Sequence, residues 1–177
     1  MGDTLQTLID KQALAELVLT YCRAVDRRDF PLLRSLYHDD AVDDHGAMFC
    51  GSADDYLAWL PPVLAQFENT VHSLSNLLFV VDGAEAQGEL YAVAYHRTRA
   101  QPAREIVIGG RYFDRYERRD GIWKFRRRSL ALDWCRVTAV DVRASQEFAA
   151  GAPPGRDDAG DPSYRALPWF TRGSPRP

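Results

Sequence analysis

The spacing of hydrophobic positions changes once along the chain, near Thr70. Before this point, apolar residues recur at three- and four-residue steps. The first such stripe consists of Leu14, Val18, Cys22 and Val25. A period of 3.6 residues places these side chains on one face of a helix. We therefore predict an amphipathic helix over residues 3–28, with Asp3 or Thr4 as its N-cap.

A second, shorter helix is predicted directly after the first. Asp29 is a favourable N-cap residue, and Pro31 fits the first turn of a helix, where a missing N–H leaves no hydrogen bond unmade. We expect this helix to run to about Tyr37. The stretch that follows, AVDDHGAMFCG at residues 41–51, indicates a short strand pair with a turn near Gly46.

The stretch SADDYLAWLPPVLAQFENT, residues 52–70, indicates a third helix. Ser52 or Asp54 is suited to cap its start. The pair Pro61–Pro62 is expected to interrupt or kink it, because proline lacks the backbone N–H that a helix interior requires.

After Thr70 the chain is rich in residues that favour strands. The predicted strands are Leu74–Val81, Ala86–Thr98, Glu105–Arg118 and Ile122–Val137. The dipeptides Asp82–Gly83 and Asp120–Gly121 separate consecutive predicted strands. Asp120–Gly121 is a strong hairpin signal, because both residues of such a turn need positive φ. Gly109–Gly110 within a strand indicates a bulge or bend rather than a phosphate loop. Helices followed by a long antiparallel meander predict an α+β fold.

Residues 1–148 are predicted to form this one domain, and residues 149–177 a tail rich in glycine, proline and arginine. Two alternatives remain open for the tail. Trp169 and Phe170 dock on the body or on a neighbouring subunit, or the tail is mobile.

The composition narrows the class of protein. The chain has 177 residues and a formal net charge of −3, so electrostatics gives no reason to expect binding to nucleic acid or to an anionic membrane. No apolar run approaches the ~18 residues of a membrane span, and no signal peptide is evident. The chain has three cysteines, Cys22, Cys50 and Cys135, which lie far apart in the sequence. An odd number at wide spacing favours free thiols in a reducing compartment such as the cytoplasm.

Asp26 and His72 are the first candidates for chemistry. Asp26 lies at the edge of the apolar stripe, where an unpaired carboxylate is unusual. His72 is placed just before an apolar strand. A carboxylate that accepts a hydrogen bond from one imidazole nitrogen fixes the tautomer and raises the basicity of the other nitrogen. The hypothesis of a catalytic pair therefore requires a hydrogen bond between Asp26 and His72, whereas the alternatives are a surface ion pair for Asp26 and a structural role for His72.

Further candidates come from the strands. Alternation places His96 on one face with Leu90, Ala92 and Ala94, which suits a pocket wall or a face packed under a helix. Alternation also places Arg126 and Arg128 on one face and Arg127 on the other; an inward guanidinium such as that of Arg128 can stabilise a developing anion.

Tyr21 and the stretch Asp43–His45 have simpler explanations than a functional site. The hydroxyl of Tyr21 is a possible donor, although core packing is the simpler explanation. Asp43, Asp44 and His45 are suitable metal ligands by type, but neighbours on a strand point to opposite faces, so we expect no metal site there.

Three stretches together resemble the SnoaL-like branch of the nuclear transport factor 2-like superfamily. They are LAELVLTYCRAVDRRDFPLLRSLYHDDA, TVHSLSNLLF and IVIGGRYFDRYERRDGIWKFRRRS, and the similarity extends over residues 5–140. The resemblance implies a cone-shaped α+β barrel, in which three N-terminal helices cover a strongly bent sheet around a deep pocket. It also implies a dimer or trimer formed through the open sheet.

Within this branch the sequence is similar to the dehydrochlorinases and dehydratases, which need no cofactor. The resemblance assigns His72 as the catalytic base and Asp26 as its partner, and it assigns Tyr21, His96 and Arg128 to substrate binding. It implies a lyase acting on a small, mostly apolar cyclic or aromatic substrate. An isomerase or polyketide cyclase is the near alternative, and a small-molecule-binding protein or a dioxygenase small subunit is the non-catalytic one, because a fold does not determine a function.

Overall fold

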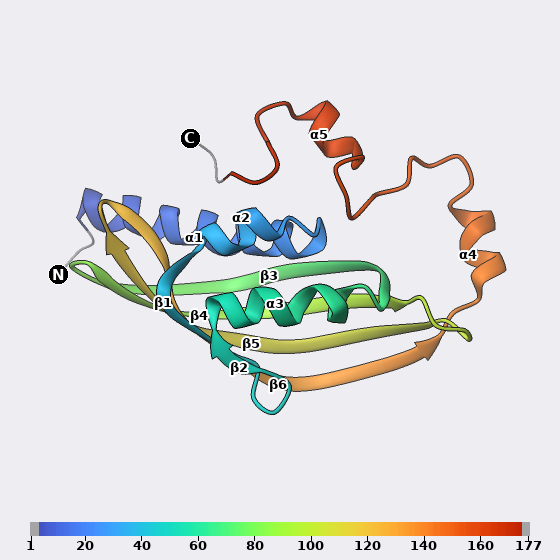
Figure 1. Cartoon of the computed structure of the whole chain (residues 1–177), viewed down its shortest axis with the longest axis horizontal. Helices are drawn as coiled ribbons and strands as arrows, with labels where there is room; N and C mark the ends of the chain where they lie inside the picture. Colours follow the sequence, from blue (N-terminus) through green and yellow to red (C-terminus); the bar gives the residue numbers. More distant parts are fainter. Residues whose placement is uncertain (1–3, 175–177) are drawn as a thin grey trace.

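The computed structural model describes residues 4–174 (Figure 1). Helix α1, Leu5–Asp26, begins at Thr4, whose side-chain oxygen accepts a hydrogen bond from the Thr7 N–H. The alternative cap, Asp3, lies outside the described residues. The predicted stripe is confirmed, since Leu14, Val18, Cys22 and Val25 are all buried. The helix ends at Asp26, two residues earlier than predicted, because Arg28 adopts a positive φ of 51°.

Helix α2, Phe30–Ser35, is capped by Asp29 and carries Pro31 in its first turn, as predicted. It stops two residues short of Tyr37, which begins strand β1, Tyr37–Asp44. Strand β2, Cys50–Ser52, pairs antiparallel with β1, and Gly46 takes a positive φ in the turn between them.

Helix α3, Ala53–Leu64, starts with a capping box in which Ser52 and Asp55 satisfy each other's backbone N–H groups. Pro61 and Pro62 lie within its last turn, and the helix ends two residues later. The prediction that this helix reaches Thr70 is wrong. Residues from Phe67 onward are extended, because they pair with the end of strand β4.

Four long strands form most of the sheet. They are β3 (Phe67–Asp82), β4 (Glu85–Thr98), β5 (Arg104–Arg119) and β6 (Ile122–Ala139). The strand order is β2-β1-β6-β5-β4-β3, with β1 parallel to β6 and every other neighbour antiparallel. Both residues of the Asp120–Gly121 turn have positive φ, so the predicted tight hairpin is confirmed. The sheet is curved and unclosed, as in the cone-shaped α+β fold that the sequence predicts (Figure 1).

Bulges decide which side chains face the helices. The register between β5 and β6 shifts at Gly109/Gly110, so the predicted bulge at the glycine pair is confirmed. A second shift, between Arg115 and Tyr116, leaves Arg126 as the extra residue on β6. Phe125 and Arg128 therefore both point inward, and the prediction that Arg126 and Arg128 share a face is wrong.

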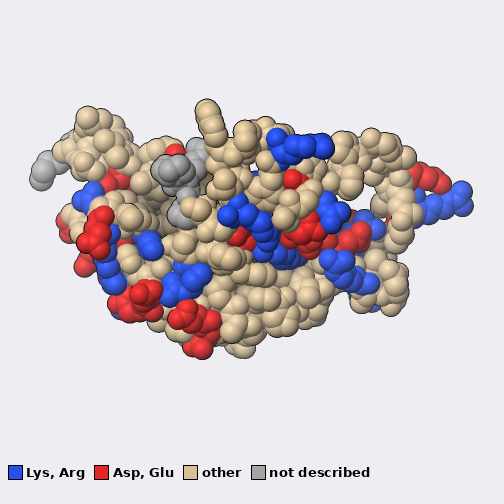
Figure 2. Space-filling view, turned by 45° about the horizontal axis from the view of Figure 1, so that its top comes forward, with Lys and Arg blue, Asp and Glu red and all other residues tan. Residues whose placement is uncertain are grey.

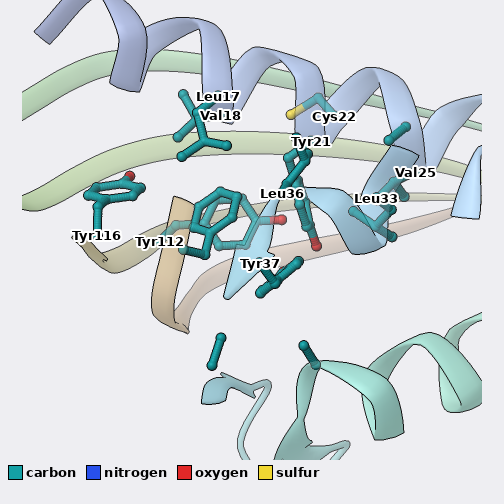
Figure 3. Close-up of a cluster of buried hydrophobic side chains, with 14 of the residues drawn as sticks. Leu17, Val18, Tyr21, Cys22, Val25, Leu33, Leu36, Tyr37, Tyr112 and Tyr116 are labelled. Carbon is teal, nitrogen blue, oxygen red and sulfur yellow. The ribbon is translucent and has the colours of Figure 1, made fainter. Parts of the chain in front are cut away.

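The core lies between the sheet and the three N-terminal helices and contains many aromatic rings. Tyr21 from α1 packs edge-on against Tyr112 from β5 and Phe125 from β6, and Tyr37 lies beside them (Figure 3). Leucine and valine side chains of α1 and α2 close this cluster from above (Figure 3).

After β6 the chain forms α4, Val142–Phe148, and α5, Pro162–Ala166, and returns to the helical side of the sheet near α1 and α2 (Figure 1). The Arg23 guanidinium lies over the rings of Tyr164 and Phe170, while Trp169 is exposed. This C-terminal segment, residues 149–174, thus contacts the α1 surface of its own chain.

Basic and acidic side chains are interspersed over the face shown in Figure 2. Many charged side chains of the protein form ion pairs, for example Arg34 with Asp54. Cys22, Cys50 and Cys135 are all free thiols. Within residues 4–174, no helix has the length and apolar character needed to cross a bilayer.

Candidate active site

The hydrogen bond that the catalytic hypothesis requires is present. Asp26 is the last residue of α1, and its carboxylate reaches strand β3. Asp26 Oδ1 lies 2.7 Å from His72 Nδ1, and Oδ2 accepts a 2.8 Å hydrogen bond from the His72 backbone N–H. Both side chains are only about one-tenth exposed, at 11% for Asp26 and 10% for His72. The carboxylate therefore holds both the ring and the backbone of His72.

This geometry fixes the state of the imidazole. A carboxylate oxygen can only accept, so Nδ1 of His72 carries the proton of the neutral ring. The other nitrogen, Nε2, then presents its lone pair and can act as a base. When Nε2 takes up a proton, the adjacent Asp26 carboxylate stabilises the resulting imidazolium.

His72 lies within β3, five residues after the strand begins, and not just before a strand as the sequence suggested. Thr70 and His72 are two residues apart and share a face, so the Thr70 hydroxyl also reaches Asp26 Oδ1, at 2.9 Å. Sequence reasoning missed Thr70 because it assigned that residue to a helix. The T-x-H spacing at Thr70 and His72 was the available signal.

His96 lies beside this pair. It is opposite Thr70 in the β3–β4 register, and its ring is 5.5 Å from the His72 ring in an edge-to-face arrangement. Burial, together with the nearby His72 ring, lowers the pKa of His96 to about 4. His96 is thus neutral near pH 7, and its Nδ1 has no hydrogen-bond partner within the described part of the chain.

The sheet surface next to the pair is apolar. In the strand registers His72 is followed across the sheet by Ala94, Ile108 and Cys135. Leu132 and Val137, on the same face of β6, are 60% and 49% exposed. Three surface hollows formed by residues 4–174 lie away from the Asp26–His72 pair, and neither Asp26 nor His72 lines any of these three.

Tyr21 and Arg128 belong to a second polar cluster, deeper under the helices. The Tyr21 and Tyr56 hydroxyls are 2.7 Å apart. Arg128 makes two hydrogen bonds to Asp114, Nε–Oδ1 at 2.9 Å and Nη2–Oδ2 at 2.6 Å. Its guanidinium lies 4.1 Å from the ring centroids of both Tyr21 and Tyr112. The structure thus brings Asp26, His72 and His96 together and gives Tyr21 and Arg128 other partners.

Asp43 and His45 extend the second cluster. The Tyr37 hydroxyl donates to Asp43 Oδ2 at 2.6 Å, and His45 Nε2 lies 2.7 Å from Asp43 Oδ1, an ion-pair distance without hydrogen-bond geometry. Asp44 points to the other side of the strand and accepts from Arg127. Burial, with the nearby Asp43 carboxylate, raises the pKa of Tyr37 well above its ordinary value, so this phenol is a neutral donor.

The chain is similar in sequence to a known domain family and to a known dehydrochlorinase. Residues 6–129 match the model of the SnoaL-like domain. The gamma-hexachlorocyclohexane dehydrochlorinase of Sphingobium indicum is 27% identical over 132 residues, which cover 73% of this chain and 85% of that protein.

Two solved structures are also similar. A hexachlorocyclohexane dehydrochlorinase (LinA) type 2 has a TM-score of 0.68 at 25% identity, covering 76% of this chain and 93% of that one. A protein of Novosphingobium aromaticivorans, provisionally named a scytalone dehydratase, has a TM-score of 0.66 at 27% identity, covering 77% and 91%.

Proposed function

This chain belongs to the SnoaL-like domain family, and we propose that it is a lyase of the dehydratase or dehydrohalogenase type that needs no cofactor. The observation that carries the proposal is the hydrogen bond between Asp26 and His72, at 2.7 Å, in a nearly buried setting. The substrate is a small, mostly apolar cyclic or aromatic molecule, in keeping with the alanine, leucine and isoleucine side chains around the pair.

In the proposed reaction, His72 Nε2 removes a proton from a substrate carbon. The electron pair of the broken C–H bond forms a carbon–carbon double bond, and the bond to the neighbouring leaving group breaks to release water or halide. Asp26 holds the proton of the neutral ring on Nδ1, so that Nε2 presents its lone pair, and it stabilises the imidazolium that forms. General-base catalysis contributes roughly 10²–10⁴-fold, so positioning in the site must supply much of the remaining acceleration.

His96 is the proposed partner of the leaving group. Its neutral ring carries one N–H, and its ring lies 5.5 Å from that of His72, a separation at which one small substrate can contact both. Tyr21 and Arg128 are proposed to act from the substrate's other side. Arg128 Nη1 is buried and has no hydrogen-bond partner among residues 4–174, so it has capacity to bind an electronegative substrate atom.

The relatives support an elimination in general rather than one substrate. A dehydrochlorinase and a protein provisionally named a dehydratase are both similar to this chain. An isomerase or a polyketide cyclase would use the same proton abstraction. Product mass distinguishes them, because an elimination product is lighter than its substrate by HCl or water and an isomer is not.

The test is a screen of dehydratable and dehydrohalogenatable cyclic compounds, followed by His72→Ala on any substrate found. We expect kcat/KM to fall by roughly 10²–10⁴-fold. His38→Gln is the matched control, because His38 is a buried histidine that contacts the Glu117 carbonyl instead of Asp26. Full turnover by His72→Ala on a true substrate would eliminate the proposal.

A second test needs no substrate. Neutral His72, followed by ¹⁵N NMR, should be protonated at Nδ1 in the parent protein and should populate both tautomers in Asp26→Ala, because the carboxylate accepts from Nδ1. An unchanged tautomer in Asp26→Ala would mean that the carboxylate does not orient the base.

We also propose that the chain forms a homo-oligomer through the outer face of the sheet. The side chains Val71, Tyr91, Val93 and Trp134 are between 42% and 51% exposed there, and Val93 and Trp134 pair with opposite sides of Gly109 in the strand registers. Light scattering coupled to size exclusion should give a dimer or trimer. A Val93→Glu variant should dissociate it, and a monomeric parent protein would contradict this proposal.

A further inference from the structure

The turn that follows Asp26 has an unusual conformation. Arg28 adopts φ = 51°, a region that side chains other than glycine rarely occupy. Such a conformation persists where surrounding contacts hold it, and it is frequent at functional sites. In this position the Arg28 side chain turns back toward strand β3 and is only 11% exposed.

The Arg28 guanidinium contacts the site through Thr70. Nη1 of Arg28 donates to Thr70 Oγ1 at 2.9 Å and to the Val25 carbonyl at 2.9 Å, and Nη2 donates to the Leu64 carbonyl at 3.3 Å. A guanidinium only donates, so the Thr70 oxygen must be the acceptor. The single proton of the Thr70 hydroxyl is then directed to Asp26 Oδ1, 2.9 Å away. Arg28 thus orients the hydroxyl that orients the carboxylate.

The C-terminal segment holds this turn from the other side. Arg172 donates from Nη1 to the Arg27 carbonyl at 2.8 Å and from Nη2 to the Arg28 carbonyl at 2.6 Å. The Gly173 N–H donates to Asp29 Oδ2 at 2.9 Å. Three consecutive residues after Asp26 are therefore fixed by a segment that lies outside residues 6–129, the range matched by the SnoaL-like domain.

We propose that Arg28 is a positioning residue for the Asp26–His72 pair, and that Arg172 of the C-terminal segment keeps the Arg28 turn in place. Arg28 acts through Thr70 and does not touch His72. Its effect on turnover rests on the proposed function, but its effect on the hydrogen bonding of His72 does not. The positioning role of Arg28 and the proposed lyase function can therefore fail separately.

The tautomer of neutral His72 is the direct readout, measured by ¹⁵N NMR above the pKa of the ring. The parent protein should be protonated at Nδ1. In Arg28→Met, which keeps side-chain bulk but removes all donors, part of the population should shift to the Nε2-protonated form, because Asp26 is held less firmly. On a true substrate, kcat should fall about three- to tenfold with little change in KM, the range expected for loss of one hydrogen bond.

A matched pair at Thr70 keeps the test decisive if Arg28→Met does not fold. Thr70→Ser retains the hydroxyl and should keep the parent tautomer, whereas Thr70→Val has nearly the same shape without it and should show the shift. Parent-like tautomers in both Arg28→Met and Thr70→Val would overturn the role of Arg28. Arg172→Met should shift the tautomer in the same direction by a smaller amount, and an unshifted tautomer there would overturn the role of the C-terminal segment.

The outcomes also separate this inference from the proposed function. If His72→Ala abolishes turnover while Arg28→Met and Thr70→Val leave the tautomer unchanged, the lyase proposal stands and the positioning role falls. If the tautomer shifts but no compound in the screen is converted, the positioning role stands without the lyase.

Discussion

Replacing Arg128 should destabilise the fold far more than replacing its neighbour Arg126. The side chains of Arg128 and Asp114 are both 0% exposed and joined by two hydrogen bonds. Burial opposes the charge on Arg128, but the adjacent Asp114 carboxylate more than offsets this and raises the pKa of the guanidinium well above its ordinary value. The guanidinium of Arg128 is therefore charged inside the core.

The magnitude follows from what Arg128→Met leaves behind. Within residues 4–174, Asp114 would keep only the 2.7 Å hydrogen bond from the Tyr116 hydroxyl, and its carboxylate would have no counter-charge in contact. Removing one member of a buried ion pair typically costs 3–5 kcal/mol in the free energy of unfolding. For a chain of this size each kcal/mol lowers Tm by roughly 2–4 °C, so the expected drop is about 6–20 °C.

The assay is urea unfolding followed by circular dichroism, with Tm measured in parallel. Arg126→Met is the matched control, because the Arg126 side chain is 37% exposed and its ion pairs with Asp40 and Glu117 lie at the surface. Such surface pairs contribute about 0–1 kcal/mol. The double variant Arg128→Met/Asp114→Asn removes the isolated charge and should recover a large part of the lost stability.

A loss below about 1 kcal/mol for Arg128→Met, equal to that of the control, would refute the reasoning. It would mean that Asp114 becomes hydrated or protonated at little cost in free energy, and hence that water reaches the interior around it. A large loss of unfolding free energy in both the single and the double variant would instead mean that the effect comes from the lost packing of Arg128 between Tyr21 and Tyr112.

Two further predictions concern the pH dependence of stability and the glycine bulge. The pKa of His96 is about 4 in the folded protein against an ordinary 6.5, so the unfolded chain binds the extra proton first. Stability relative to His96→Gln should thus be full above pH 6.5 and fall by up to about 3 kcal/mol as the pH drops to 4, and a flat difference in unfolding free energy would contradict this. A Cβ added at Gly110 would lie 2.4 Å from the Ala131 backbone oxygen, so Gly110→Ala should cost about 1–3 kcal/mol by urea unfolding. Gly109→Ala should cost less, because the added Cβ meets only the half-exposed Trp134 ring, which can move aside; equal losses would argue against this distinction.

Much of the fold can be read from local patterns. The 3.6-residue stripe on α1, the caps at Asp29 and Ser52, and the Asp120–Gly121 hairpin depend on neighbours in the sequence, so their physical causes are visible there. The order of helices before strands then restricts the architecture to an α+β arrangement. For the site, the sequence offered Asp26 and His72 as suitable types of residue, and the resemblance supplied most of the reason to pair them.

Tertiary structure alone decided which side chains meet. Phe67–Thr70 carry no clear strand pattern, and they are extended because β4 offers unpaired backbone groups to them. One extra residue at Arg126 moves Arg128 to the inner face, since side chains alternate strictly along a strand and a bulge reverses that alternation. The guanidinium of Arg28 contacts Thr70, the hydroxyl of Thr70 contacts Asp26, and the carboxylate of Asp26 contacts His72, and each contact joins residues far apart in sequence. Local periodicity determines the face that a side chain occupies within its own element, and only the packing of elements determines what lies opposite it.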